Sequence, residues 1–469
     1  MPTFPPDLTL FAHSSVNDAS GALRLSEAPP LFSLAAGRDA LCGYSLPLSI
    51  SAADAAAFAA ARASGALSPA EDRALGCMLG MAVGDALGAP FEFLPYRPGG
   101  VPASTAGLGA PPLDEVENAF GLQPGQWTDD ASMGLCLADS LLANGFELAP
   151  LDLLLRFVAW WDFGYVRAPR ACLALARAQL LTPPPPRAPR PQNNAFRFDG
   201  ARASRGSVGL GGTIGASLAA FKRTGLAATR SGDARSSGNG SIMRLAAVPV
   251  LHHADEGAAA AAARAQSLAT HQGVEAAECA ALMAVVISRA IRAPGADAAA
   301  RKAAVLGSLA AYACGGCPAV ERLARSVGEP GGGEERDWRW KRSPPGAHGY
   351  APARARAQPG YVGSYAMDAL AMALHCVHAT GSAAEALLLA ANLRGDCDTV
   401  AAIAGQIAGA IYGAGALPRE WVRRVELWDG GGGIALKAHC LFARIPAARE
   451  AAPPPPPPPP PAAAGPAGV

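Results

Sequence analysis

Two short acidic motifs carry the residue types in this chain that are best suited to chemistry. They are Thr-Asp-Asp at 128–130 and Gly-Asp-Cys-Asp-Thr at 395–399, and each is followed by small or apolar residues. Carboxylates at a helix N-terminus are favoured by the helix dipole and stay ionised, which suits a hard cation such as Mg²⁺. Asp and Thr are also ordinary N-terminal residues, so each motif taken alone is more simply a polar cap on a core helix.

The two motifs together are harder to explain as caps. Both lie at the starts of helices that we expect to be fully buried, and unpaired buried carboxylates are costly without a cation. We therefore expect residues 128–130 and 395–399 to meet in space around a common centre.

A glycine-patterned helix is predicted to pack closely against a neighbouring helix. Four glycines recur every four residues and so share one helix face: Gly76, Gly80, Gly84 and Gly88. Glycine weakens a helix by up to about 1 kcal/mol at each position, so four in register imply close packing of a neighbouring helix. Pro90 is expected to end the helix, which puts Glu92 on the loop just after it.

Two glycine-rich turns precede further predicted helices. One covers residues 205–213, and the other covers 237–241, with a helix expected from about Ile242. Their backbone N–H groups could hold a phosphate, although a single turn of this kind is more often a plain turn. His271 lies at the junction of two predicted helices, where a histidine is more often a cap than a functional group.

The composition favours an all-helical protein. Of 469 residues, 50% are hydrophobic and 16% are charged, and the surplus is mostly alanine, the best helix former. A formal net charge of +1 without a basic block gives no sign of a nucleic-acid surface. The 10 scattered cysteines suggest free buried thiols in a reducing compartment, and the pair Cys314 and Cys317 is interpreted as structural.

The sequence also predicts limits and location. Residues 1–69 are expected to be a partly ordered N-terminal extension, 70–445 one helical domain, and 446–469 a disordered tail with a polyproline run. Residues 166–192, rich in proline and arginine, are expected to be an exposed insertion. No apolar run is expected to reach the roughly 20 residues that a membrane helix needs, so no membrane contact is predicted. The N-terminus lacks signal features, so the predicted location is cytoplasmic, with an organelle left open.

Five short motifs in a fixed order carry a family resemblance. They are G-D-A-L-G-A-P-x-E at 84–92, W-T-D-D at 127–130, G-N-G-S-I-M-R at 238–244, T-H at 270–271 and G-D-C-D-T at 395–399. In this order and spacing they resemble the ADP-ribosylglycohydrolase family, which includes hydrolases of ADP-ribosylated arginine and serine. The resemblance runs from about Asp72 to about Phe442. Ala131 and Arg394 depart from the family pattern, which bears on specificity more than on metal binding.

The resemblance implies a compact single-domain orthogonal helical bundle with two Mg²⁺ ions between the acidic motifs. The implied metal ligands are Thr128, Asp129, Asp130, Asp396, Asp398 and Thr399. Glu92 falls where some members place a catalytic carboxylate, with Asp129 and Asp130 as the other implied catalytic residues. The implied substrate-binding residues are Asp85, Gly238, Asn239, Gly240, Ser241, Met243 and His271.

The activity implied is Mg²⁺-dependent removal of ADP-ribose from a modified protein or a small conjugate, by a protein expected to be monomeric. The acceptor stays open among arginine, serine and O-acetyl linkages. One alternative is a non-catalytic relative that binds ADP-ribose or serves a structural role, as in crystallin-like members. Another is a two-metal phosphoesterase that shares the acidic motifs by chance, which the motif order disfavours.

Overall fold

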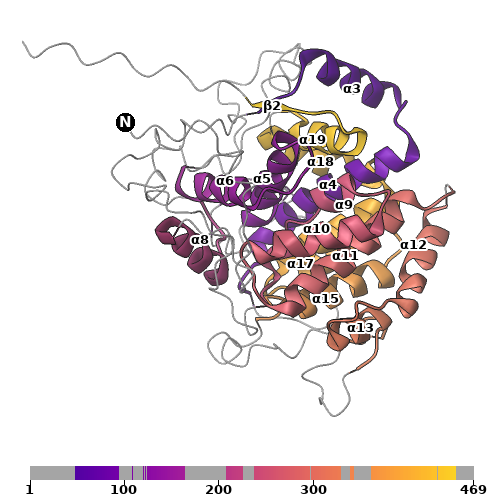
Figure 1. Ribbon diagram of the computed structural model, residues 1–469. Helices are drawn as coiled ribbons and strands as arrows, with labels where there is room; N and C mark the ends of the chain where they lie inside the picture. The colour runs from indigo at the N-terminus through magenta and orange to yellow at the C-terminus, as the bar shows by residue number, and fades with distance from the viewer. Residues whose placement is uncertain are drawn as a thin grey trace, which may run out of the picture.

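The computed structural model describes residues 48–94, 108, 120, 122, 124–163, 207–224, 237–295, 297–328, 338–342, 361–429 and 431–449. The sequence prediction of an all-helical fold is confirmed (Figure 1). The α-helices are α3 (Ala52–Ser64), α4 (Pro69–Gly88), α5 (Asp129–Ala143), α6 (Pro150–Phe163), α8 (Gly212–Thr224), α9 (Ala247–Leu251), α10 (Glu256–Leu268), α11 (Val274–Arg292), α12 (Ala298–Gly307), α13 (Pro318–Arg325), α15 (Ala366–Ala379), α16 (Ala383–Asn392), α17 (Cys397–Tyr412), α18 (Arg419–Asp429) and α19 (Gly433–Ala443). Short 3-10 turns are η1 (Ala89–Phe91), η5 (Asn239–Ser241), η6 (Ser308–Ala311) and η8 (Ala414–Ala416).

The two ends of the described chain meet in a two-residue antiparallel pairing. Strand β1 (Leu48–Ser49) pairs with β2 (Ala448–Arg449), next to α3 and α19. Both strands fall outside the limits predicted for the helical domain, and those limits stay a prediction. The predicted insertion at 166–192 and the polyproline run lie outside the described residues.

Helices α4 and α17 pack backbone against backbone along the glycine face. A Cβ added to Gly80 would lie 2.1 Å from the carbonyl oxygen of Gly405, and one added to Gly84 would lie 2.1 Å from that of Ala401. Only a glycine on this face lets the two helices come so close. The close packing predicted from the fourfold glycine spacing is confirmed.

The glycine face of α4 extends to the second acidic motif, at the N-terminus of α17. At the end of α4, a Cβ on Gly88 would lie 2.5 Å from the Cα of Asp398. The α-helix stops at Gly88, and η1 continues through Pro90, so Glu92 follows the helix as predicted. Asp85 and Glu92 are thereby placed beside the N-terminus of α17.

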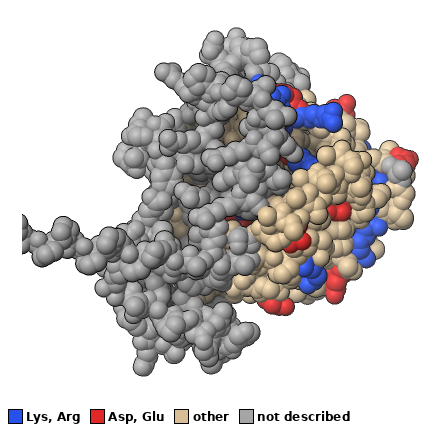
Figure 2. Space-filling view, turned by 90° about the horizontal axis from the view of Figure 1, so that it is seen from above, with Lys and Arg blue, Asp and Glu red and all other residues tan. Residues whose placement is uncertain are grey.

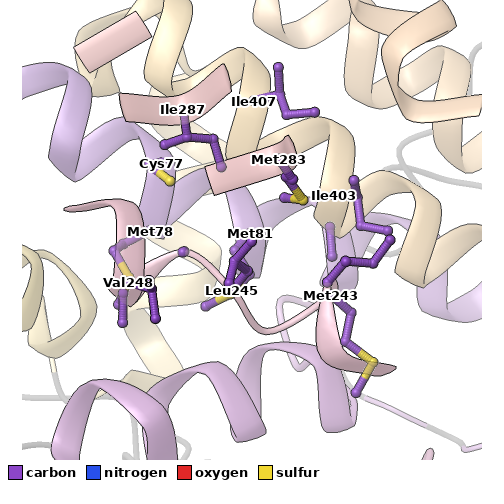
Figure 3. Close-up of a cluster of buried hydrophobic side chains, with 14 of the residues drawn as sticks. Cys77, Met78, Met81, Met243, Leu245, Val248, Met283, Ile287, Ile403 and Ile407 are labelled. Atoms are coloured by element: carbon purple, nitrogen blue, oxygen red, sulfur yellow. The ribbon is translucent and has the colours of Figure 1, made fainter. Parts of the chain in front are cut away.

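The remaining core is built around this pair. Figure 1 shows α10, α11, α17 and α15 in successive rows, and neighbouring helices in these rows are in contact. Figure 3 shows sulfur-containing and branched side chains meeting between α4, α11, α17 and the segment that leads into α9: Cys77, Met78, Met81, Met243, Leu245, Val248, Met283, Ile287, Ile403 and Ile407. These side chains are buried, so the acidic site rests on a packed apolar base.

Two sequence expectations about individual helices were wrong. The segment Pro69–Phe91 is, by length and composition, apolar enough to cross a membrane, although its most apolar window is buried completely inside the fold. The helix expected from about Ile242 begins only at Ala247. A 3-10 turn at Asn239–Ser241 precedes it: the N–H of Asn239 donates to Ser364 on a neighbouring segment, and its carbonyl accepts from Ile242 and Met243.

The described cysteines are free thiols, and the described surface mixes positive and negative charges. The eight cysteines in the described ranges are free, and all but Cys314 are buried. Figure 2 shows Lys and Arg interspersed with Asp and Glu over the described part of one face, so neither sign forms a broad patch there.

Candidate active site

The two acidic motifs meet, as the sequence predicted. The Thr399 hydroxyl lies 3.1 Å from Oδ1 of Asp130, and the Thr128 hydroxyl lies 3.3 Å from Oδ2 of Asp398. The motifs belong to the N-termini of α5 and α17, so the positive ends of two helix dipoles converge on the same carboxylates.

Asp85 on α4 caps helix α5 from outside. Its Oδ1 accepts from the backbone N–H of Thr128 at 2.8 Å, and its Oδ2 accepts from that of Ala131 at 2.9 Å. Thr128 is the N-cap residue by position, as predicted, but its own side chain makes no capping bond. Asp85 is fully buried and does not line the cavity, so the structure gives no support to direct substrate binding by this residue.

Six buried carboxylates gather here, and all of them except Asp129 belong to two close groups. Within each group one oxygen per residue lies within 4.8 Å of the others: Asp85, Asp130 and Asp398 make the first, and Glu92, Asp396 and Asp398 make the second. Asp398 belongs to both groups. One oxygen of Glu92 and one of Asp130 are buried without a hydrogen-bond partner.

Burial and mutual repulsion oppose ionisation of this cluster. Burial raises the pKa of Asp85 to about 7 and that of Asp129 to about 8, in the second case with help from the charge of Asp85. Burial, and then the charges of Asp398 and Asp396, raise the pKa of Glu92 well above its ordinary value. Carboxylates this close cannot all be ionised unless a positive charge lies among them.

The donor set fits a hard cation. The two close groups consist of carboxylate oxygens, and threonine hydroxyls lie against them; such oxygens are the ligands that Mg²⁺ and Ca²⁺ prefer. The unpaired buried oxygens of Glu92 and Asp130 are the kind of atom that a bound cation would satisfy.

A cavity of about 270 Å³ opens beside the carboxylates. The predicted site residues that line it are Glu92, Asp129, Gly238, Asn239, Gly240, Met243, His271, Asp396, Asp398 and Thr399. The predicted residues that do not line it are Asp85, Thr128, Asp130 and Ser241. Lining residues that the sequence analysis did not single out for the site are Phe93, Gly209, Leu210, Gly211, Gly212, Thr213, Ile214, Tyr361 and Ser364.

Segment 361–366, which is extended up to Tyr365 and enters α15 at Ala366, ties the separate parts of the site together. Val362 accepts a backbone hydrogen bond from Asp396 at 2.8 Å, and Ser364 accepts one from Asn239 at 3.2 Å. The Asn239 amide also donates to Gly363 at 2.8 Å and to Oδ2 of Asp396 at 2.9 Å. Asn239 thus holds Asp396 in place. The only signal for this segment in the sequence is a pair of glycines before a helix, which is too common to identify a site.

The turn before α8 presses on the acidic motif from the other side. Gly209 has φ +92°, and a Cβ there would lie 2.1 Å from Oδ1 of Asp129. Only glycine meets both conditions. The turn places the N-terminus of α8, at Gly212 and Thr213, on the cavity wall, where free backbone N–H groups favour an anion.

A buried hydrogen-bonded chain leads from Arg244 through Thr270 to His271. Arg244, fully buried over the Phe157 ring, donates to the Thr270 hydroxyl at 2.7 Å, and that hydroxyl lies 2.9 Å from Nδ1 of His271. The hydroxyl accepts from Arg244 and can donate its own proton to Nδ1, which would leave the ring proton on Nε2. Burial and the charge of Arg244 lower the pKa of His271 to about 3. His271 is therefore neutral, and in this tautomer its Nε2–H is a donor at the cavity.

Comparison with known proteins agrees with these findings. The ADP-ribosylglycohydrolase family model matches residues 66–450. The chain is 31% identical over 380 residues to the ADP-ribosylarginine hydrolase Tri1 of Pseudomonas putida (strain GB-1), covering 81% of this chain and 80% of that protein. It is 26% identical over 370 residues to the ADP-ribosyl-(dinitrogen reductase) glycohydrolase of Rhodospirillum rubrum, covering 76% of this chain and 91% of that protein. A solved structure, an ADP-ribosylglycohydrolase-related protein complex, matches with TM-score 0.52 and 29% identity over 80% of this chain and 100% of that one.

Proposed function

This chain belongs to the ADP-ribosylglycohydrolase family, and on that premise we propose that it cleaves the glycosidic bond between ADP-ribose and a modified side chain or small acceptor. The observation that carries the proposal is the meeting of six buried carboxylates beside a glycine-lined cavity. Arginine is the acceptor that we propose, because a relative covered over 80% of its length is named an ADP-ribosylarginine hydrolase.

We further propose that two Mg²⁺ ions occupy the carboxylate cluster. The residues that would hold them are Thr128, Asp129, Asp130, Asp396, Asp398 and Thr399. The sharing of Asp398 between two close groups supports two ions rather than one. When bound, such ions would orient the ribose hydroxyls and lower the pKa of an attacking water.

Glu92 is the residue that we propose to move a proton. It lines the cavity beside Asp396 and Asp398, and one of its oxygens is buried without a partner. Cleavage of a glycosidic bond proceeds through an oxocarbenium-like state, in which the leaving atom must gain a proton and the water must lose one. A carboxyl with a free oxygen at this wall can serve either step.

The N-terminus of α8 and His271, which also line the cavity, would bind the part of the substrate that does not react. The backbone N–H groups at Gly212 and Thr213 and the Nε2–H of His271 are donors that suit diphosphate oxygens. Binding energy gained there orients the ribose over the carboxylates. Asn239 contributes indirectly, because its amide is engaged in holding Asp396.

The test is release of ADP-ribose by the full chain from arginine-linked, serine-linked and O-acetyl substrates, with Mg²⁺ and with a chelator. We expect Mg²⁺-dependent release, fastest from arginine. Glu92→Gln should lose about 10²–10⁴-fold in turnover while keeping its calorimetric affinity for ADP-ribose and for Mg²⁺. Glu147→Gln, on an exposed residue outside the cavity, is the matched control and should be unchanged.

Each part of the proposal has its own contrary outcome. Binding of ADP-ribose without release from any linkage would favour the non-catalytic relative. Full activity in Glu92→Gln would remove that residue from proton transfer and leave Asp129 or Asp130 for the role. Loss of Mg²⁺ affinity in Glu92→Gln would make it a ligand instead, since it lies in one of the two close carboxylate groups.

A further inference from the structure

Phe93, next to Glu92, has a strained and exposed conformation. Its φ of +69° lies in the left-handed region, which a bulky aromatic residue rarely adopts, and its side chain is 40% exposed. The strain is held by two backbone bonds to the residue before Asp396: Phe93 N–H donates to Gly395 at 3.0 Å, and Gly395 N–H donates to Leu94 at 2.8 Å. Strained residues persist where the surroundings enforce them, often at binding sites.

A second left-handed phenylalanine shows what a purely structural case looks like. Phe146, with φ +73°, follows the end of α5, where its N–H bonds back to Leu141 at 2.8 Å, and its ring packs against the core. The strain at Phe146 is offset by a helix end and by burial. Phe93 ends no α-helix, and its ring remains much exposed, so stability alone does not account for it.

The Phe93 ring belongs to a small aromatic group at the cavity. It stacks on Tyr361, with ring centroids 5.9 Å apart and planes 17° apart, and meets Phe120 edge-on at 5.8 Å. Phe93 and Tyr361 both line the cavity, as do Glu92 and Asp396. Tyr361 is only 5% exposed, so it supports the Phe93 ring and leaves that ring as the accessible surface.

We propose that Phe93, supported by Tyr361, is the platform on which the guanidinium group of an ADP-ribosylated arginine stacks. This inference rests on the proposed function, because it places the leaving group beside Glu92. A planar cation favours an aromatic face and nearby carboxylates, and both are present here. The diphosphate is better matched by the N-terminus of α8, whose backbone N–H groups line another part of the cavity.

The platform makes a substrate-specific prediction. Phe93→Leu keeps an apolar side chain but removes the aromatic face, so kcat/KM for arginine-linked ADP-ribose should fall about 2- to 30-fold, mainly through a higher KM. Hydrolysis of O-acetyl-ADP-ribose, whose acceptor carries no charge, should change little. Phe93→Tyr, which keeps the aromatic face, should retain hydrolysis of arginine-linked ADP-ribose. Phe146→Leu, the same substitution at the other left-handed phenylalanine, should leave both substrates unaffected.

The outcomes separate the platform from the proposed function. Equal loss on both substrates, or no loss on arginine, would overturn the platform while the hydrolase proposal stands. If the chain without substitutions releases ADP-ribose from no substrate, the proposed function fails, and calorimetric affinities then test the platform. That chain should bind arginine-linked ADP-ribose more tightly than free ADP-ribose, and Phe93→Leu should remove the difference. Equal affinities in the unmodified chain would refute it.

Discussion

Gly80→Ala is expected to destabilise the protein, although alanine is the better helix former. The new Cβ would lie 2.1 Å from the carbonyl oxygen of Gly405 and 2.7 Å from its carbonyl carbon. Both are backbone atoms of α17, so no side chain can rotate away. To reach 3.0 Å, the shortest separation that real Cβ atoms tolerate, α4 and α17 would have to separate by about 0.9 Å.

The magnitude follows from two opposing effects. A gap of this size forfeits about a quarter to a half of the dispersion energy along the contact, and overpacking typically costs about 1–3 kcal/mol. Because backbone blocks backbone, we expect the upper end of that range. The helix propensity of alanine offsets about 1 kcal/mol. The net expectation is a loss of about 2 kcal/mol in the free energy of unfolding.

Gly307→Ala is the matched control. Gly307 ends α12 with a helical φ of −63°, and a Cβ there would meet nothing within 4 Å. This variant should be neutral or more stable by up to about 1 kcal/mol. The assay is urea unfolding followed by circular dichroism and by tryptophan fluorescence, with coincident transitions required. A Gly80→Ala variant as stable as Gly307→Ala would refute the backbone contact between α4 and α17.

Three further predictions address the site and the chain limits. Asp398→Asn should abolish the rise in melting temperature that Mg²⁺ produces, and an unchanged rise would remove Asp398 from the metal site. The control Asp255→Asn lies at an exposed helix N-cap, where Asn also caps, and should keep the rise. Thr270→Val should shift the His271 ¹⁵N resonances away from the Nε2–H tautomer and weaken ADP-ribose binding by about 2- to 12-fold, whereas Thr270→Ser should keep both. An unaltered tautomer in Thr270→Val would contradict the Arg244–Thr270–His271 chain. Deletion of residues 450–469 should leave circular dichroism and melting temperature unchanged, and loss of soluble protein would count against the predicted domain limits.

Local patterns in the sequence were sufficient for the elements and for the two acidic motifs. A fourfold glycine repeat specifies one helix face, because side chains four apart lie on the same side of a helix. That repeat predicted close packing of a neighbouring helix, and the structure identifies this helix as α17. Likewise, carboxylates before a buried apolar run mark a helix start, and Asp130 and Thr399 lie where this pattern put them. These features depend on neighbours in sequence, so sequence alone determines them.

Contacts between distant residues were decided only by the tertiary structure. Asp85 caps a helix that begins more than forty positions later, and no periodicity links the two. Segment 361–366 joins Asn239 to Asp396 through backbone groups, which every residue possesses. The strain at Phe93 follows from its bonds to Gly395 and has no compositional signal. The sequence therefore determines which groups are available, whereas the packing of α4, α5 and α17 determines which of them lie together at one buried site.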